Sequence, residues 1–188
     1  MSVITNSYGN VVGSFFNAKI QGHIEELLVS PLSEISIVIG YLAGGIIRGL
    51  AVATVVTFIA LFFTEINIKN PLMTLFVIIM TAGVFSLAGL INAIFAKKFD
   101  DIAVIPSFVL APLTYLGGVF YTVSLLPEFW QTLSRFNPIL YMINSMRYSV
   151  IGISDVSIQN ALMMIVVFFI LLFATAVILL KKGIGIRQ

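Results

Sequence analysis

The single histidine of the chain, His23, stands in the sequence HIEEL, where an imidazole lies beside two carboxylates. Zinc hydrolases of the HExxH class need a second imidazole one helical turn away, and this chain has no other histidine. The chain also has no cysteine, which excludes thiolate catalysis and cysteine-based zinc sites. A serine nucleophile needs a base beside it, and His23 is expected at a membrane surface among glutamates. We therefore expect no catalytic site and no metal site.

The sequence also lacks a nucleotide-binding motif. There is no loop of the form GxxxxGK[ST], in which backbone N–H groups and a lysine hold the phosphates of ATP. The chain is thus expected to bind no cofactor and not to hydrolyse ATP itself. Its net charge is +2, but the ten lysines and arginines are spread along the chain and form no patch. We expect no nucleic-acid partner.

The charged segment 17–34 has the pattern of a short amphipathic helix that ends before Pro31. Such a helix lies at a membrane surface or binds a partner protein, and a solvated polar face is the simpler alternative. At helical spacing, its apolar and acidic side chains are Ile24, Leu27 and Leu28 and Glu25 and Glu26.

Arg48 stands in the middle of an apolar stretch, where a charge costs at least ~2.5 kcal/mol on membrane-insertion scales. It is therefore a candidate functional residue within the membrane. A structural role is the alternative, in which Arg48 pairs with a carboxylate of a missing N-terminal helix or of a second copy, or snorkels along a bent helix. The glycines around it, Gly40, Gly44, Gly45 and Gly49, predict close helix packing.

The elements that must position these residues are membrane helices. Of the 188 residues, 60% are hydrophobic and only 10% are charged, and the mean hydropathy is +1.11. Soluble domains are about 25% charged, so we predict one all-α integral membrane domain over residues 1–188. Residues 1–16 are expected to form the end of a further span. Four stretches have the ~20 apolar residues that a spanning helix needs, namely 35–63, 72–96, 102–123 and 158–180.

The third of these stretches is interrupted by Pro106 and Pro112 and by the pair Gly117 and Gly118. Such breaks are tolerated at membrane depth only where protein or a cavity satisfies the freed backbone groups. This segment is predicted to be packed, kinked or re-entrant, with a turn at Pro112, Gly117 and Gly118. The following region, 125–155, suits a helix at the outer headgroup level, anchored in lipid by aromatic side chains.

Basic residues set the expected orientation of the spans. With a cytoplasmic N-terminal segment, six lysines and arginines flank the spans on the inner side and three on the outer side. This follows the positive-inside rule, so both ends are predicted to be cytoplasmic. The inner residues are Lys19, Lys97, Lys98, Lys181, Lys182 and Arg187, and the outer ones are Lys69, Arg135 and Arg147.

Three ordered motifs carry a resemblance to a known family. The stretch 110–152, LAPLTYLGGVFYTVSLLPEFWQTLSRFNPILYMINSMRYSVIG, resembles the C-terminal region of membrane permease subunits of the type-2 ABC exporters. There a broken fifth span, a GGVFY-like turn, an external helix and an NP…R pattern follow in that order. Residues 24–33, IEELLVSPLS, are similar to the family's cytoplasmic coupling helix, and residues 86–102, SLAGLINAIFAKKFDDI, to its fourth span and inner loop.

The resemblance implies a homodimeric permease in a bacterial inner membrane, with an ATP-binding cassette ATPase subunit as partner. ATP and Mg²⁺ would be bound by that partner. The residues implied in coupling are Ile24, Glu25, Glu26, Leu27 and Leu28, which would sit in a groove of the ATPase and pass its closing motion to the spans. The exported substrate would be amphipathic or hydrophobic: a drug-like compound, a lipid or a lipid-linked glycan.

The chain departs from the family pattern at its beginning, because it starts inside what would be the second of six spans. A fragment, a start at an internal methionine and a truncated, inactive paralogue remain open. A non-transporting membrane anchor that binds partners through 125–155 is a second hypothesis. An intramembrane enzyme is a third, and it would require activity without any ATPase partner.

Overall fold

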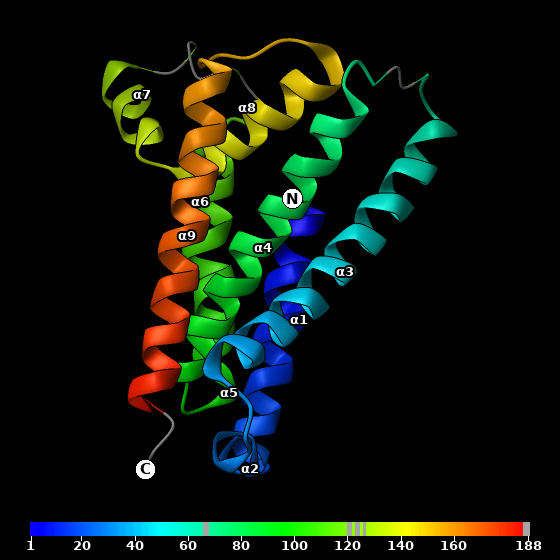
Figure 1. Cartoon of the computed structure of the whole chain (residues 1–188). Helices are drawn as coiled ribbons and strands as arrows, with labels where there is room; N and C mark the ends of the chain where they lie inside the picture. Colours follow the sequence, from blue (N-terminus) through cyan, green and yellow to red (C-terminus); the bar gives the residue numbers. More distant parts are fainter. Residues whose placement is uncertain (66–67, 120–121, 123–124, 126, 186–188) are drawn as a thin grey trace.

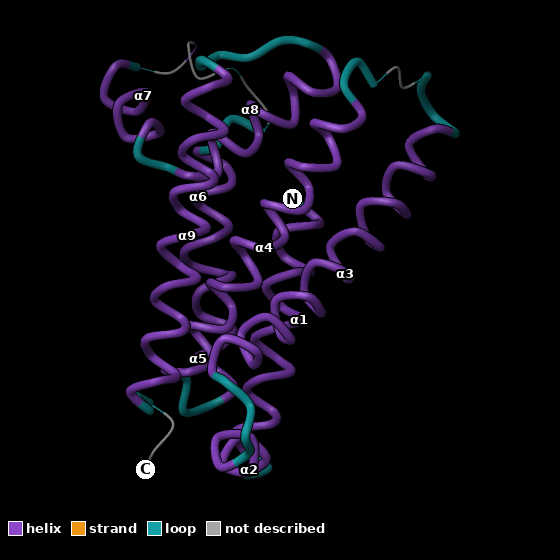
Figure 2. Tube along the Cα trace, in the orientation of Figure 1, coloured by secondary structure: helices purple, strands orange, loops and turns teal. Residues whose placement is uncertain are grey.

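The computed structural model describes residues 1–65, 68–119, 122, 125 and 127–185, without the side chains of Glu25, Leu28 and Val29. Every regular element in this part of the chain is a helix, which confirms the all-α prediction (Figures 1 and 2). In chain order the helices are α1 (Ser2–Ile20), α2 (His23–Val29), α3 (Glu34–Leu61), α4 (Pro71–Phe95), α5 (Phe99–Val104), the π-helix η1 (Ile105–Leu110), α6 (Ala111–Leu116), α7 (Glu128–Arg135), α8 (Pro138–Ile151) and α9 (Ile158–Lys182).

Among the described residues, four helical stretches are long and apolar enough to cross a membrane, as the sequence predicts. They are Glu34–Leu61, Pro71–Phe95, Phe99–Leu116 and Ile158–Lys182. In Figure 1, α4 and α9 run along the length of the molecule, whereas the later part of α3 leans away from them. The third stretch is helical only to Leu116, because Gly117 and Gly118 then turn the chain and Gly118 has a positive φ of 76°.

Helix α1 lies beside α3 and α4 and packs against both. Its inner face is fully buried and holds large side chains, among them Tyr8, Phe15 and Phe16. The Tyr8 hydroxyl accepts a hydrogen bond of 2.6 Å from the side-chain amide of Asn92 on α4. A buried polar pair of this kind stabilises only when both partners are satisfied, so it fixes the register of α1 on α4.

Small residues allow α1, α3 and α4 to approach closely. A Cβ atom at Gly45 of α3 would lie 2.8 Å from Cγ2 of Val11, and one at Gly89 of α4 would lie 2.7 Å from the carbonyl oxygen of Tyr8. Gly49 is equally crowded by Ser7, whereas a Cβ at Gly40 would meet open space. Thus two of the four glycines near Arg48, Gly45 and Gly49, serve close packing.

The segment between α4 and the turn keeps its helical course through two prolines. Pro106 lies in the first turn of η1 and Pro112 in the first turn of α6. Because proline lacks an N–H, a stretch of π-helix is a way to accommodate it without breaking the helix. Pro106 thus lies where the helix is locally widened, and the chain leaves the helix only at the two glycines.

The described part of the region 125–155 contains two helices, where the sequence predicts a single external helix. The chain breaks at Asn137–Pro138, because the residue before a proline avoids helical geometry. The Asn137 side chain accepts a hydrogen bond from the N–H of Ile139 and so caps α8. Helix α7 is mostly exposed, with Phe129 and Trp130 on its surface, whereas α8 is packed against α4, α6 and α9.

Candidate functional site

Helix α2 lies at one end of the bundle, below the ends of α1 and α3 in Figure 1. The chain turns out of α1 at Gly22, whose φ of 77° favours glycine, and α2 then runs for seven residues. Pro31 prevents its continuation, and Ser33 starts α3 by accepting a hydrogen bond from the N–H of Ser36. A short helix is thereby held between α1 and α3, at the end of the bundle that we call the α2 end.

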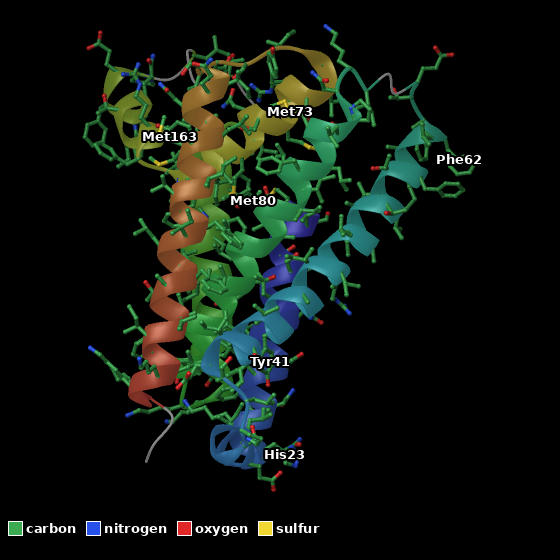
Figure 3. All side chains as sticks on the ribbon, in the orientation of Figure 1. His23, Tyr41, Phe62, Met73, Met80 and Met163 are labelled. Atoms are coloured by element: carbon green, nitrogen blue, oxygen red, sulfur yellow. The ribbon has the colours of Figure 1, made fainter. Side chains whose placement is uncertain are left out.

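The two faces of α2 differ in burial. Ile24 is 3% exposed and belongs to the hydrophobic core, and Leu27 is packed against that core. Glu26 and His23 are exposed, and Figure 3 shows His23 at the lower end of the molecule, opposite to α7 and α8. Ile24 and Leu27 therefore attach α2 to the bundle, and Glu26 is available to a partner. The side chains of Glu25 and Leu28, also implied by the family resemblance, lie outside the described residues.

Lys19 ties the end of α1 to the end of α4. Its ammonium group donates hydrogen bonds to the carbonyl oxygens of Ile94 (2.7 Å) and Ala96 (2.9 Å). The last carbonyls of a helix have no partner within it, and a cation is favourable there because of the helix dipole. Partial burial and the nearby Lys97 lower the pKa of Lys19. From the sequence, Lys19 is recognisable only as a basic residue on the predicted inner side of the membrane. A contact between residues 75 positions apart leaves no pattern in the local sequence.

The loop after α4 is held by a carboxylate. Asp101 accepts hydrogen bonds from the backbone N–H groups of Lys97 (2.8 Å) and Lys98 (2.9 Å). These bonds favour the charged form and hold the pKa of Asp101 below its usual value. The first residue of α5, Phe99, also packs edge-on against Phe16 of α1, with ring centroids 5.1 Å apart. Helices α1, α2, α4 and α5 are therefore connected at the α2 end.

Arg48 lies away from this end, in the middle of α3. Its side chain is exposed, and no described residue makes a hydrogen bond or ion pair with its guanidinium group. The structure therefore does not bring Arg48 together with the residues of α2.

Helix α6, which contains Pro112 and is followed by the predicted turn residues Gly117 and Gly118, lies in the half of the molecule opposite to α2. The carbonyl oxygen of Gly118 accepts a hydrogen bond of 2.7 Å from Arg147 of α8, and the same guanidinium pairs with Asp155 at 2.9 Å. Arg147 thus fastens the turn to α8 and to the loop before α9. The NP…R pattern contains this arginine, but its partners are visible only in three dimensions.

A cavity of about 440 Å³ lies between α1, α3, α4 and α8 in the same half of the molecule. Its walls are mainly apolar and include Val56, Val77 and Met142, and Arg147 contributes a charge. Among the described residues, no group of three histidines or acidic residues could hold a metal ion. The structure therefore offers a contact surface on α2 and a mainly apolar cavity between α1, α3, α4 and α8.

Comparisons with known proteins agree with this architecture. The family described as ABC-2 type transporter matches residues 1–151. The inner membrane transport permease YadH of Escherichia coli (strain K12) is 50% identical over 188 residues, which are 100% of this chain and 73% of YadH. Nodulation protein J of Rhizobium leguminosarum bv. viciae is 22% identical over 174 residues, or 92% of this chain and 67% of that protein. No solved structure matches with significance. The family match covers most of the chain, and the identity to YadH is 50% over the full length of the chain. The chain therefore belongs to the ABC-2 type transporters.

Proposed function

We propose that the chain is the membrane permease subunit of an ABC exporter that is driven by a separate ATPase subunit. The observation that carries this proposal is the 50% identity to a transport permease over the full length of the chain. The absence of a phosphate-binding loop in the sequence supports it, because an energy-coupled transporter then needs a partner that binds ATP and Mg²⁺.

Helix α2 is the proposed contact with the ATPase. It is short, it lies at the end of the bundle, and its exposed Glu26 is free to pair with a basic residue of a partner. Ile24 and Leu27 anchor it in the core, and Lys19 and Phe16 connect the neighbouring α1 to α4 and α5. A displacement of α2 would therefore move several helix ends together, as in rigid-body switching.

The proposed topology places the α2 end in the cytoplasm. Helices α1, α4 and α9 all end there, with Lys19, Lys97, Lys98, Lys181 and Lys182 close to their ends. This clustering of lysines fits the positive-inside rule and a location in a bacterial inner membrane. The permease would act as a homodimer in contact with membrane lipid. It would export an amphipathic or hydrophobic molecule: a drug-like compound, a lipid or a lipid-linked glycan.

Removing the charges of α2 tests the proposal. The double variant Glu25→Ala plus Glu26→Ala is compared with Glu128→Ala, which removes an exposed carboxylate from α7 in the opposite half. Binding of the ATP-binding subunit is measured in mild detergent, and the ATPase rate of the complex in proteoliposomes. We expect the α2 variant to insert normally but to bind its partner about tenfold more weakly, a loss of about 1.4 kcal/mol.

The Glu128→Ala control should bind the ATPase subunit as the unchanged protein does. If the α2 variant also binds and stimulates the ATPase normally, α2 is not the coupling element. A membrane anchor that uses 125–155 as its partner surface would give the reverse pattern, in which only the Glu128→Ala variant loses its partner.

A further inference from the structure

Helix α8, in the half of the molecule opposite to α2 (Figure 1), is attached to the start of α4 through main chain and buried side chains. In the loop before α4, the N–H of Asn70 donates a hydrogen bond of 2.9 Å to the carbonyl oxygen of Ser149. The N–H of Lys69 donates a second one, of 3.3 Å, to the carbonyl oxygen of Val150. The hydroxyl group of Thr74 on α4 donates a hydrogen bond of 3.0 Å to that of Ser149, which is fully buried. Buried hydrogen bonds are costly to break, so we expect α8 and α4 to move together.

Helix α8 also holds two other segments, and here it uses its own side chains. The guanidinium group of Arg147 donates a hydrogen bond of 2.7 Å to the carbonyl oxygen of Gly118, in the turn after α6. The same group pairs at 2.9 Å with the carboxylate of Asp155, in the loop before α9. The amide oxygen of Asn144 accepts a further bond of 2.9 Å from the N–H of Asp155. Among the described residues, no main-chain hydrogen bond joins α8 to 117–119 or to 153–157.

The end of α6 lies directly against α8. A Cβ atom at Gly117 would lie 3.0 Å from Cγ2 of Ile139 on α8. The side-chain amide of Asn137, which caps α8, donates a hydrogen bond of 2.5 Å to the carbonyl oxygen of Leu113. Thr114 is 2% exposed and lies one turn before Gly117, on the same side of the helix. Thr114 therefore marks the side of α6 that faces α8.

Arg147 is the described side chain of α8 that hydrogen-bonds to both segments at once. Asn137 reaches the α6 side alone, and Asn144 the loop before α9 alone. A guanidinium group is planar and carries five N–H donors, so it holds two acceptors in a fixed arrangement. A rotation of this one side chain would remove a contact from each segment together. The turn could then move, because Gly118, with a φ of 76°, is a glycine and has many backbone conformations open to it.

We propose that Arg147 is a positioning residue that latches the turn after α6 and the loop before α9 to α8, and that this latch opens during transport while α8 stays attached to α4. The inference rests on the proposed function, in which a displacement at the α2 end must reach the opposite half of the molecule. Helix α4 supplies the connection, because Lys19 is bound to its end and Ser149 to its start.

Two buried reporter positions test the latch in the complex as purified from its membranes and reconstituted in nanodiscs. Thr114→Cys reports on the α6 side of α8, and Ser149→Cys is the matched control on the α4 side. Each replaces a buried hydroxyl group by a thiol of similar size, in a stretch of 188 residues without cysteine. The probe is a water-soluble maleimide, and mass spectrometry of the permease chain gives its rate of reaction. Nanodiscs expose both membrane faces, so the rate does not depend on the orientation of the chain.

Breaking the latch should expose one reporter and not the other. Asp155→Asn keeps the size of the side chain and the N–H bond to Asn144, and we expect it to make Thr114→Cys react about fivefold faster. With Arg147→Gln we expect an increase of at least about tenfold, because both segments lose a charge-assisted contact. Ser149→Cys should change by less than about twofold in either background. Asp155→Glu keeps the charge and should leave both rates nearly unchanged.

Equal increases at both reporters would overturn the inference, because Arg147 would then only stabilise the fold as a whole. Unchanged rates at Thr114→Cys would overturn it as well, since the turn would be held without Arg147. A faster reaction at Ser149→Cys alone would show that α8 separates from α4, which also contradicts the latch. If Arg147→Gln does not fold, Asp155→Asn gives the same readings.

Addition of ATP tests the link to transport with Arg147 unchanged. We expect ATP with vanadate to speed the reaction of Thr114→Cys several-fold and to leave that of Ser149→Cys unchanged. A complex that hydrolyses ATP without any change at Thr114→Cys would overturn the role of the latch in transport. If no ATP-binding subunit is present in the complex, the proposed function fails, and the Asp155→Asn comparison still decides whether Arg147 latches the turn.

Discussion

Helices α3 and α4 are similar in length and apolar character but have opposite surroundings. Helix α3 has 28 residues and α4 has 25, and both pass as membrane spans. In the most apolar 18-residue window, 61% of the residues of α4 are buried, against 11% in α3. Helix α4 packs against α1, α3, α8 and α9, whereas α3 leans away from the bundle and carries Phe62 far from α4 (Figure 3).

The difference lies in the small and polar residues of the two helices. Helix α4 buries Gly83, Ser86, Gly89 and Asn92, which let neighbours approach and hydrogen-bond. Helix α3 buries Gly45 and Gly49 and exposes most of its large side chains. In a membrane, where lipid tails are as apolar as leucine, close packing of small residues decides which helix is central. The hydropathy of α3 and α4 identifies both as candidate spans, but it does not show which helices pack against them.

The largest expected effect is at a glycine of α4. In Gly89→Leu the new Cβ would meet the carbonyl oxygen of Tyr8 at 2.7 Å, and backbone cannot easily yield. We expect a loss of about 3 kcal/mol or more in the free energy of unfolding. The matched control is Gly40→Leu on α3, where a Cβ meets open space and stability should hold or rise slightly. Thermal unfolding in detergent measures both, and equal losses would break the comparison.

A second pair of variants shortens one large side chain on α4 and one on α3. Leu87 of α4 is fully buried, so Leu87→Ala should cost about 2–5 kcal/mol through lost contacts and the cavity left behind. Phe58 of α3 is 62% exposed, and Phe58→Ala should change stability by less than about 0.5 kcal/mol. Chemical denaturation of the purified variants checks these values. A Phe58→Ala loss as large as that of Leu87→Ala would show that α3 has a structural partner.

The smallest effect concerns the loop after α4, where Asp101 accepts hydrogen bonds from the backbone N–H groups of Lys97 and Lys98. The described residues show no such contact at the end of α3. The folded-state pKa of Asp101 is below the usual 3.8, so its stabilisation is complete above that value and is lost as the pH falls through the folded pKa. Asp101→Asn should therefore be slightly less stable than the unchanged protein at pH 6, and the difference should shrink below pH 3.8. Thermal unfolding across this range measures it. A gap that widens in acid would contradict the assignment.

Much of the fold follows from apolar runs alone. The four candidate spans agree with the apolar runs of the sequence. The packing of α1 against α3 and α4 does not follow from these runs, because its glycines and asparagines dilute the apolar signal that marks a span. The division into α7 and α8 could have been read from Asn137–Pro138, since a residue before proline avoids the helical region.

The contacts that organise the candidate site could not be predicted locally. Lys19 reaches carbonyl oxygens 75 and 77 residues away, and Arg147 reaches Gly118 across 29 residues. Such pairs depend on how helices are placed in three dimensions, and a basic residue near a span end reads only as a topological charge. Likewise, Arg48 is identifiable from the sequence as an unusual charge, but its exposed position in the middle of α3 is known only from the structure.

The central claim is that this permease works with a separate ATP-binding subunit. Native mass spectrometry of the complex, purified from its own membranes in mild detergent, tests it most directly because one spectrum gives both masses and stoichiometry. We expect two permease chains bound to two ATP-binding subunits. A permease that is released without any nucleotide-binding chain, under conditions that preserve other membrane complexes, would contradict the proposed function.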